Sequence, residues 1–209
     1  MTGKFLYRKG DNSHIALMID GIDAINGIDG NHLYFDDARR FGNVQIVTGE
    51  GVAAHLQNLK LGPDVLEHSL RGETKWIPAA TWQQIFRKPS IQKWSLCKAL
   101  LDQKLVAGIG NYLKSEIMYY AGLHPERQLL SLSDTDLERL RVCAHKIILL
   151  SYSYNGLTIE NYMAPDGALG CYPKAIYGRE GLTDVYGNLI VKTDTSDKRS
   201  TFWVPTIQK

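Results

Sequence analysis

The amino-acid sequence predicts an α+β fold in which β-structure comes first, helices follow, and a small β-hairpin ends the chain. Short β-branched and aromatic runs, separated by turn residues, occupy residues 1–50. Apolar residues then recur with helical spacing from about 79 to 153, and glycines and prolines return at 156–173 before a last β-rich segment. With 209 residues, of which 44% are hydrophobic, the chain can bury a sizeable core.

The first part of the chain contains patterns typical of strands. Turn residues divide them, and the glycine-rich segment 21–31 is expected to be a loop. A short helix is expected at 52–60, where Leu-Gly-Pro at 61–63 stops it. The four predicted strands are FLYR at 5–8, HIALMI at 14–19, HLYF at 32–35 and NVQIV at 43–47.

The middle of the chain carries the helical pattern. AATWQQIF at 79–86 is one candidate helix, and two more flank the glycine-containing sequence 108–111. Ser133 and Asp136 have the spacing of a capping box and predict the start of a long helix. The buried stripe of that helix is expected to consist of Leu137, Leu140, Ala144 and Ile147.

The last part of the chain, residues 175–209, predicts a hairpin. The runs AIYGR, LIVK and TFW are expected to pair around a tight Tyr-Gly-Asn turn at 186–188.

Charge and cysteine content narrow the classes of function. The net charge of +2 and pI of about 8.3 are too mild to indicate a nucleic-acid partner. Locally, however, residues 87–127 hold seven Lys or Arg against three acids, while 11–37 holds six Asp and no Lys or Arg. Three separated cysteines without a C-x-x-C pair predict neither a disulfide framework nor a metal site. Because no apolar run of about 18 residues and no signal peptide is present, we expect an intracellular protein without membrane contact.

The most informative stretch is KALLDQKLVAGIGNYLKSEIMYYAGLHP at 98–125, which predicts helix, glycine-rich turn and helix. Gly108 and Gly110 let the backbone approach another surface closely. The second helix presents free N–H groups and the positive end of its dipole, with the Asn111 amide beside them. These features can form a phosphate-binding corner. Taken alone, they are a weak signal, and a tight turn between two helices would explain them as well.

The whole stretch closely resembles the helix-two-turns-helix motif of the formamidopyrimidine-DNA glycosylase/endonuclease VIII (Fpg/Nei) family. In that family the motif asparagine contacts a DNA phosphate next to the lesion and the lysine lies near the damaged nucleotide, which implies these roles for Asn111 and Lys98. The matching residues are Lys98, Asp102, Gln103, Gly108, Gly110, Asn111, Ser115, Glu116, His124 and Pro125.

FDDARRFGNV at 35–44 resembles a second family segment. The resemblance implies that Arg39 and Phe41 enter the duplex and fill the gap that the flipped base leaves, and Met1 aligns with the third gap-filling residue. Without the family resemblance, Arg39 and Phe41 would be interpreted as a strand end with a core phenylalanine.

The C-terminal hairpin resembles the DNA-binding finger of the family, in which Arg199 would contact the phosphate at the flipped nucleotide. The family's four zinc-binding cysteines are absent, and Val204 and Ile207 occupy the last two of those positions. The resemblance is therefore to a zincless finger with no metal and no cofactor. We expect apolar packing to hold it, through Val204, Ile207, Trp203 and Leu182.

The resemblance implies three parts: a remnant of the N-terminal β-sandwich at 1–66, the helix-two-turns-helix domain at 67–155, and a lesion-recognition loop with a zincless finger at 156–209. It further implies a monomer that binds double-stranded DNA with damaged or abasic sites, in the cytoplasm and nucleoid or the nucleus. The expected function is the damaged-DNA-binding part of a base-excision-repair glycosylase and AP lyase for oxidised bases.

The family's catalytic N-terminal Pro-Glu does not appear in this sequence, which opens with Met1-Thr2-Gly3. We expect either a start further upstream or a split or decayed product. Removal of Met1 would leave Thr2 with a free α-amine, which could form a Schiff base at an abasic site. The alternatives to the enzyme are a non-catalytic binder of abasic or damaged DNA and an interaction domain whose helix-turn-helix is purely structural.

Overall fold

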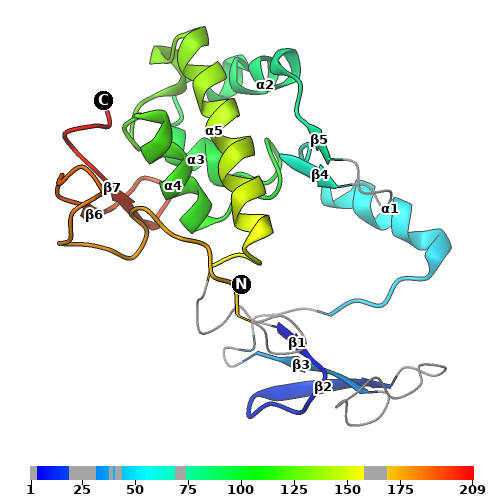
Figure 1. The fold of residues 1–209 in the computed structure, drawn as a ribbon. Coiled ribbons are helices and arrows are strands. Elements are labelled where there is room, and N and C mark those ends of the chain that lie inside the picture. Colours follow the sequence, from blue (N-terminus) through cyan, green and yellow to red (C-terminus); the bar gives the residue numbers. More distant parts are fainter. Residues whose placement is uncertain (1–3, 19–31, 38–39, 41–43, 69–73, 158–168) are drawn as a thin grey trace. The chain divides into compact units, whose positions relative to one another are not determined.

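The computed structural model describes residues 4–18, 32–37, 40, 44–68, 74–157 and 169–209 (Figure 1). The chain forms two compact units. The first contains residues 1–48 and 151–173, and the second contains residues 49–150 and 174–209. The predicted α+β fold is confirmed, because strands lie before and after a helical middle part of the chain.

The first unit is built on a three-stranded antiparallel sheet in the order β1-β3-β2. The strands are β1 (Lys4–Leu6), β2 (Ser13–Met18) and β3 (His32–Asp36). The Phe5 and Phe35 rings, cross-strand partners, lie 5.1 Å apart. These three strands confirm three of the predicted runs. The fourth predicted strand, at 43–47, is wrong over its described residues, because residues 44–47 form no strand.

The second unit contains most of the helices. The elements before the long helix are α1 (Gly49–Leu59), β4 (Leu66–His68), β5 (Thr74–Trp76), α2 (Ala79–Phe86), the 3-10 turn Pro89–Ile91, α3 (Leu96–Leu101), α4 (Asn111–Ala121) and the 3-10 turn Leu129–Ser131. Within the described residues, no helix has the length and apolar character needed to cross a bilayer.

The long helix α5 (Asp134–Ser153) begins at the predicted capping box. The Ser133 hydroxyl accepts the Asp136 N–H at 3.1 Å, and the Asp136 carboxylate accepts the Ser133 N–H at 3.0 Å. The reciprocal bonds satisfy donors that the helix itself leaves open. All four residues of the predicted stripe are buried. Side chains buried alongside it in this unit include Trp82, Phe86, Leu96, Leu100, Ile117 and Met118.

The C-terminal hairpin pairs β6 (Val191–Asp194) with β7 (Ser200–Trp203), and β7 packs against α4 (Figure 1). Its turn lies at 195–199, whereas the sequence predicted a turn at 186–188. The run 175–179 forms no strand, and the turn at 186–188 closes only an isolated bridge between Thr183 and Leu189. The error arose because Tyr-Gly-Asn is the stronger local turn signal, whereas strand pairing depends on contacts with α4.

The packing of the hairpin differs in part from the prediction. Val204 is fully buried and Ile207 packs partly buried beside it, as expected. Leu182 is 55% exposed and does not belong to this cluster. The apolar centre is completed by Tyr119 of α4, Ile176 and Ile190. The helix therefore supplies part of the core of the finger.

Candidate nucleic-acid interface

The turn between α3 and α4 is held from inside by one side chain, Gln103. Its Oε1 accepts the Gly108 N–H at 3.0 Å, and its Nε2 donates to the carbonyls of Ile109 at 2.9 Å and Leu101 at 3.1 Å. The amide thereby forms hydrogen bonds with backbone groups that the turn would otherwise leave unpaired. The N-terminus of α4 is placed by this local network.

The two glycines of the turn have different roles. Gly108 has a φ of 97°, and a Cβ there would lie 3.0 Å from the Asp64 carboxylate. Gly110 is the N-cap of α4 with a φ of −98°, and a Cβ there would meet nothing within 4 Å. The conformation requires glycine only at position 108. At position 110 the surrounding space is open, so another molecule can approach the backbone.

A second segment lies directly against the turn. Gly62 donates its N–H to the Gln103 carbonyl at 2.8 Å, and Ala107 donates to the Pro63 carbonyl at 2.9 Å. A Cβ at Gly62 would lie only 2.3 Å from the Leu105 carbonyl oxygen, so this approach requires glycine. The segment after α1 therefore supports the base of the turn.

Asn111 begins α4 and connects it to the hairpin. Its Nδ2 donates to the Ser200 carbonyl in β7 at 3.0 Å. Its Oδ1 is buried and has no hydrogen-bond partner within the described part of the chain. The sequence predicted an amide beside the N–H groups of the helix start. The structure gives that amide a bond to the hairpin.

The turn of the hairpin is rigid and carries two cations. Lys198 donates its N–H to the Thr195 carbonyl at 2.8 Å and has a φ of 61°. Thr195 donates its N–H to the Arg199 carbonyl at 3.1 Å, and its Oγ1 lies 2.8 Å from the same carbonyl oxygen. The side chains of Lys198 and Arg199 are exposed. The Arg199 guanidinium forms no ion pair with the described residues.

Below this turn, a fully buried lysine meets a buried aspartate. Lys114 of α4 is 0% exposed and donates from Nζ to Asp197 Oδ2. Burial lowers the pKa of Lys114, an effect that Asp197 opposes. Burial alone would raise the pKa of Asp197, but hydrogen bonds from Lys114 and Thr195 hold it below its ordinary value. Each side chain therefore favours the charged form of the other, against the cost of burial.

Glu116 ties α4 to the segment that leads into the hairpin. Its carboxylate accepts the backbone N–H groups of Ala175, Ile176 and Tyr177 at 2.8 to 2.9 Å. Glu116 is fully buried, so these bonds replace the water that the carboxylate lost. One turn further along, Tyr119 donates to Asp184 at 3.0 Å, and burial with this bond raises the pKa of Tyr119.

Lys98 lies on α3 and is exposed, with its Nζ 4.1 Å from the centre of the Trp94 ring. The aromatic face holds the lysine stem and orients its ammonium group. No hydrogen bond or ion pair joins Lys98 to Asn111 or Arg199 in the described ranges. Among the predicted site residues, the structure brings together Asn111 and the turn that bears Arg199, and places Lys98 on a neighbouring helix.

The predicted gap-filling residues Met1, Arg39 and Phe41 lie outside the described residues, as does Thr2. Most of the expected lesion-recognition loop lies outside them as well, since residues 158–168 are not described.

Sequence reasoning missed the buried ion pair between Lys114 and Asp197. The partners are 83 positions apart, so no local pattern joins them. A signal was available in α4 itself, where Lys114 and Glu116 interrupt a helix in which six of the nine other residues are buried. Charged residues at such positions are retained only with partners.

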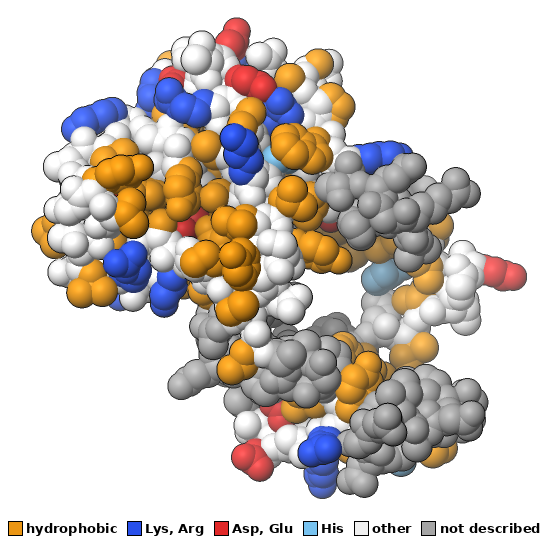
Figure 2. Space-filling view, in the orientation of Figure 1, with side chains coloured by type: hydrophobic (Ala, Val, Ile, Leu, Met, Phe, Trp, Pro, Cys, Tyr) orange, Lys and Arg blue, Asp and Glu red, His pale blue; other side chains and the backbone are white. Residues whose placement is uncertain are grey.

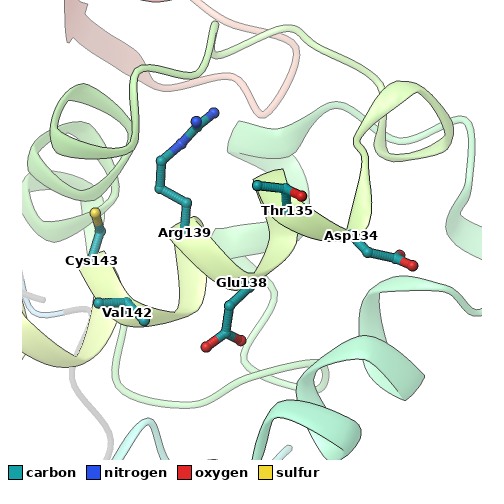
Figure 3. Close-up of a pocket in the computed structure, with 6 residues that line it drawn as sticks. All are labelled: Asp134, Thr135, Glu138, Arg139, Val142 and Cys143. Carbon is teal, nitrogen blue, oxygen red and sulfur yellow. The ribbon is translucent and has the colours of Figure 1, made fainter.

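A shallow pocket on α5 does not contain the predicted site. Six residues line it, and Figure 3 shows that all of them lie along this one helix. All three of its charged side chains are already engaged: Asp134 pairs with Arg87, Glu138 with Arg141 and Arg139 with Asp136, each at 2.6 Å. On the face drawn in Figure 2, Lys and Arg side chains are scattered among apolar ones and form no single basic patch. An anion site would therefore depend on particular residues and not on a broad basic surface.

Comparison with known proteins assigns a DNA-glycosylase domain to the same region of the chain. Residues 72–162 match the family model of the formamidopyrimidine-DNA glycosylase H2TH domain. The formamidopyrimidine-DNA glycosylase of Escherichia coli O1:K1 / APEC is 33% identical over 196 residues, covering 91% of this chain and 66% of that protein. The enzyme of Cereibacter sphaeroides is 30% identical over 202 residues, covering 95% of this chain and 65% of its own length. The chain thus spans about 65% of the length of these curated relatives.

Solved structures of proteins of the same name resemble this chain in fold. The crystal structure of the MutM (Fpg) protein from Thermus thermophilus has a TM-score of 0.78 and 29% identity, covering 100% of this chain and 73% of that one. The complex of Lactococcus lactis Fpg with DNA containing an abasic site has a TM-score of 0.79 at 21% identity and covers 100% of this chain and 72% of that one, which shows a shared fold. From the glycine turn, the hairpin packed on α4 and these similarities, we conclude that this chain belongs to the formamidopyrimidine-DNA glycosylase family.

Proposed function

We propose that this chain is the damaged-DNA-binding part of a base-excision-repair DNA glycosylase and AP lyase that acts on oxidised bases. The observation that carries the proposal is the 3.0 Å bond from Asn111 Nδ2 to the Ser200 carbonyl. It places the start of α4 beside the residue that follows Arg199, so two groups suited to phosphates share one support.

Each group suits a phosphate in a different way. At the start of α4, the first N–H groups have no partner within the helix, and no acidic residue lies in the first turn. The open space at Gly110 lets a phosphate approach them. Arg199 adds an exposed guanidinium, which can bind a phosphate through two hydrogen bonds. Together these donors can bind the backbone on either side of one nucleotide.

The remaining roles follow from the resemblance to the family. Lys98 lies near the damaged nucleotide, and Met1, Arg39 and Phe41 fill the gap left by the flipped base. The protein acts as a monomer inside the cell, in the compartment that holds its DNA, and its functional parts are 1–66, 67–155 and 156–209. Relatives that carry the name formamidopyrimidine-DNA glycosylase support the substrate class.

The binding test uses a gel shift with a duplex that carries one tetrahydrofuran abasic-site analogue, compared with the intact duplex. We expect preference for the abasic duplex and a loss of about tenfold in affinity for Asn111→Ala and Arg199→Ala. Lys192→Ala is the matched control, because Lys192 is an exposed cation on the same hairpin. Equal affinity for both duplexes, or no loss in either variant, contradicts the proposal.

Borohydride trapping on a duplex with a natural abasic site tests the chemical part. A covalent adduct requires an amine that attacks the sugar and forms a Schiff base, which borohydride reduces. An adduct supports lyase action by this chain. A gel shift without an adduct instead favours the second candidate, a non-catalytic binder of abasic or damaged DNA.

A further inference from the structure

The buried pair of Lys114 and Asp197 lies where the finger meets α4. The Lys114 side chain is 0% exposed and that of Asp197 is 4% exposed. A buried lysine must be paired, because an unpaired ammonium in a dry environment loses its hydration without compensation. Lys114 comes from the first turn of α4, three residues after Asn111, and so shares the rigid support of the phosphate corner.

Asp197 is the centre of the hairpin turn. Its Oδ1 accepts the Thr195 hydroxyl at 2.6 Å and the Arg199 N–H at 3.1 Å. Its Oδ2 is left for Lys114. One carboxylate therefore organises the backbone of the turn with one oxygen and fastens the turn to α4 with the other.

The turn has a second attachment on its other side. Ser196 donates its N–H to the Glu126 carboxylate at 2.7 Å, and its hydroxyl lies 2.6 Å from that of Ser95. Two attachments, one through Asp197 and one through Ser196, define the orientation of a short turn better than either alone. The residue whose backbone binds Asp197 directly is Arg199.

We propose that Lys114 is a positioning residue, which fastens the finger turn to α4 through Asp197 and so presents Arg199 to the DNA backbone. This inference rests on the proposed function, since it gives Arg199 a phosphate to contact. The charge balance agrees with it: Lys114 and Arg199 are close enough to repel one another, and Asp197 lies against both residues. The buried ion pair gives the finger turn a fixed connection to α4.

The test removes the connection and keeps the turn. In the double variant Lys114→Met with Asp197→Asn, neither charge is left buried alone, and the amide oxygen of asparagine can still accept from Thr195 and Arg199. The matched control is Arg141→Met with Glu138→Gln, which removes a 2.6 Å ion pair on α5. Affinity for the abasic-analogue duplex is measured over a range of salt concentrations, with Arg199→Ala added to each background.

In the native background we expect Arg199→Ala to lower affinity about tenfold and to reduce the slope of log K against log salt by about 1. The double variant alone should show the same loss and the same smaller slope. Adding Arg199→Ala to it should change affinity less than about twofold, because a mispositioned Arg199 no longer contributes. The control pair should leave both quantities unchanged.

Three results separate the two proposals. If Arg199→Ala has its full effect in the double variant as well, Lys114 does not position Arg199, and the proposed function stands without this inference. If the native chain shows no preference for the abasic duplex, both fall together. Hydrogen exchange of the free protein gives an independent measure: the Lys198 and Arg199 amides should exchange faster in the double variant than in the control, and equal rates would overturn the inference.

Discussion

The two glycines in the turn before α4 differ in whether their backbone conformation requires glycine, and each can be tested separately. Gly108 adopts a φ of 97° beside the Asp64 carboxylate, whereas Gly110 adopts a φ of −98° in open space. We expect Gly108→Ala to lower the free energy of unfolding by about 1 to 2 kcal/mol, since a side chain disfavours positive φ. Gly110→Ala should change it by less than about 0.5 kcal/mol. Urea unfolding of both variants compares them, and equal losses would contradict the assignment.

His145 gives the helical unit a dependence on pH. It is fully buried on α5, and its Nε2 accepts the Ile77 N–H at 3.2 Å, which requires the neutral ring. Burial, with the nearby Arg141 charge, lowers the pKa of His145 to about 4. The unfolded chain therefore binds a proton below pH 6.5, whereas the folded chain does so only near pH 4. Stability from this residue is complete above about pH 6.5 and is lost as the pH falls toward about 4.

His145→Gln tests this dependence, because its amide oxygen can accept the same N–H without titrating. Between about pH 6.5 and 4 the native chain should lose up to about 3 kcal/mol more than the variant. The carboxylates with a lowered pKa act in a lower pH range, because their contribution to stability is lost only as the pH falls through their folded pKa; they are Asp136, Glu138, Asp184 and Asp197. Parallel curves for the two proteins in the upper window would refute the role of His145.

Among the elements, α5 depends on its first turn. Ser133 and Asp136 exchange two hydrogen bonds there. Ser133→Ala should lower the free energy of unfolding by about 1 kcal/mol, because one helix N–H loses its acceptor. Thr135→Ala, at an exposed position two residues on, is the control and should change it by less than about 0.5 kcal/mol. Thermal unfolding that ranks the two variants in the opposite order would exclude a functional capping box.

The finger depends on apolar packing with α4. Ile190 is 1% exposed and packs with Tyr119, Ile176 and Val204, whereas Leu182 is 55% exposed. We expect Ile190→Ala to lower the free energy of unfolding by about 2 to 5 kcal/mol through the cavity it creates. Leu182→Ala should have an effect below about 0.5 kcal/mol. Urea unfolding measures both losses, and a large loss in Leu182→Ala would show that Leu182 belongs to the buried cluster after all.

Elements set by nearby residues could be predicted from the sequence, and elements set by distant partners could not. The capping box of Ser133 and Asp136 spans three residues, so its pattern is visible in the chain. The same holds for the helices that flank the glycine turn. The hairpin was predicted with its turn at 186–188, but its register follows from β7 packing on α4, which no local pattern records.

At the scale of the whole molecule, the chain leaves the helical unit near Ser151 and returns to it at Lys174. The return brings Arg199 beside the turn that Gly108 and Asn111 form, and residues far apart in sequence make one candidate surface. The sequence predicted these residues singly, by motif. It could not predict that Asn111 binds the hairpin or that Lys114 pairs with Asp197, because both contacts depend on how the finger docks.

The salt dependence of binding separates the two phosphate contacts. Arg199→Ala should reduce the slope of log K against log salt by about 1, since a cation that neutralises a phosphate releases counterions. Asn111→Ala should lower affinity and leave the slope unchanged, because a neutral amide releases none. Fluorescence anisotropy with a labelled abasic duplex between about 50 and about 200 mM salt measures both. A reduced slope for Asn111→Ala would mean that its loss also displaces a cation.

The last residues of the chain close the helical unit. Gln208 is buried, accepts the Val204 N–H at 2.7 Å and donates to the Leu123 carbonyl at 2.9 Å, while His124 donates to the Lys209 carbonyl at 3.0 Å. During synthesis, Leu123 emerges 85 residues before its partner Gln208. The Leu123 carbonyl therefore gains this partner only once Gln208 has also left the ribosome, well after α4 itself.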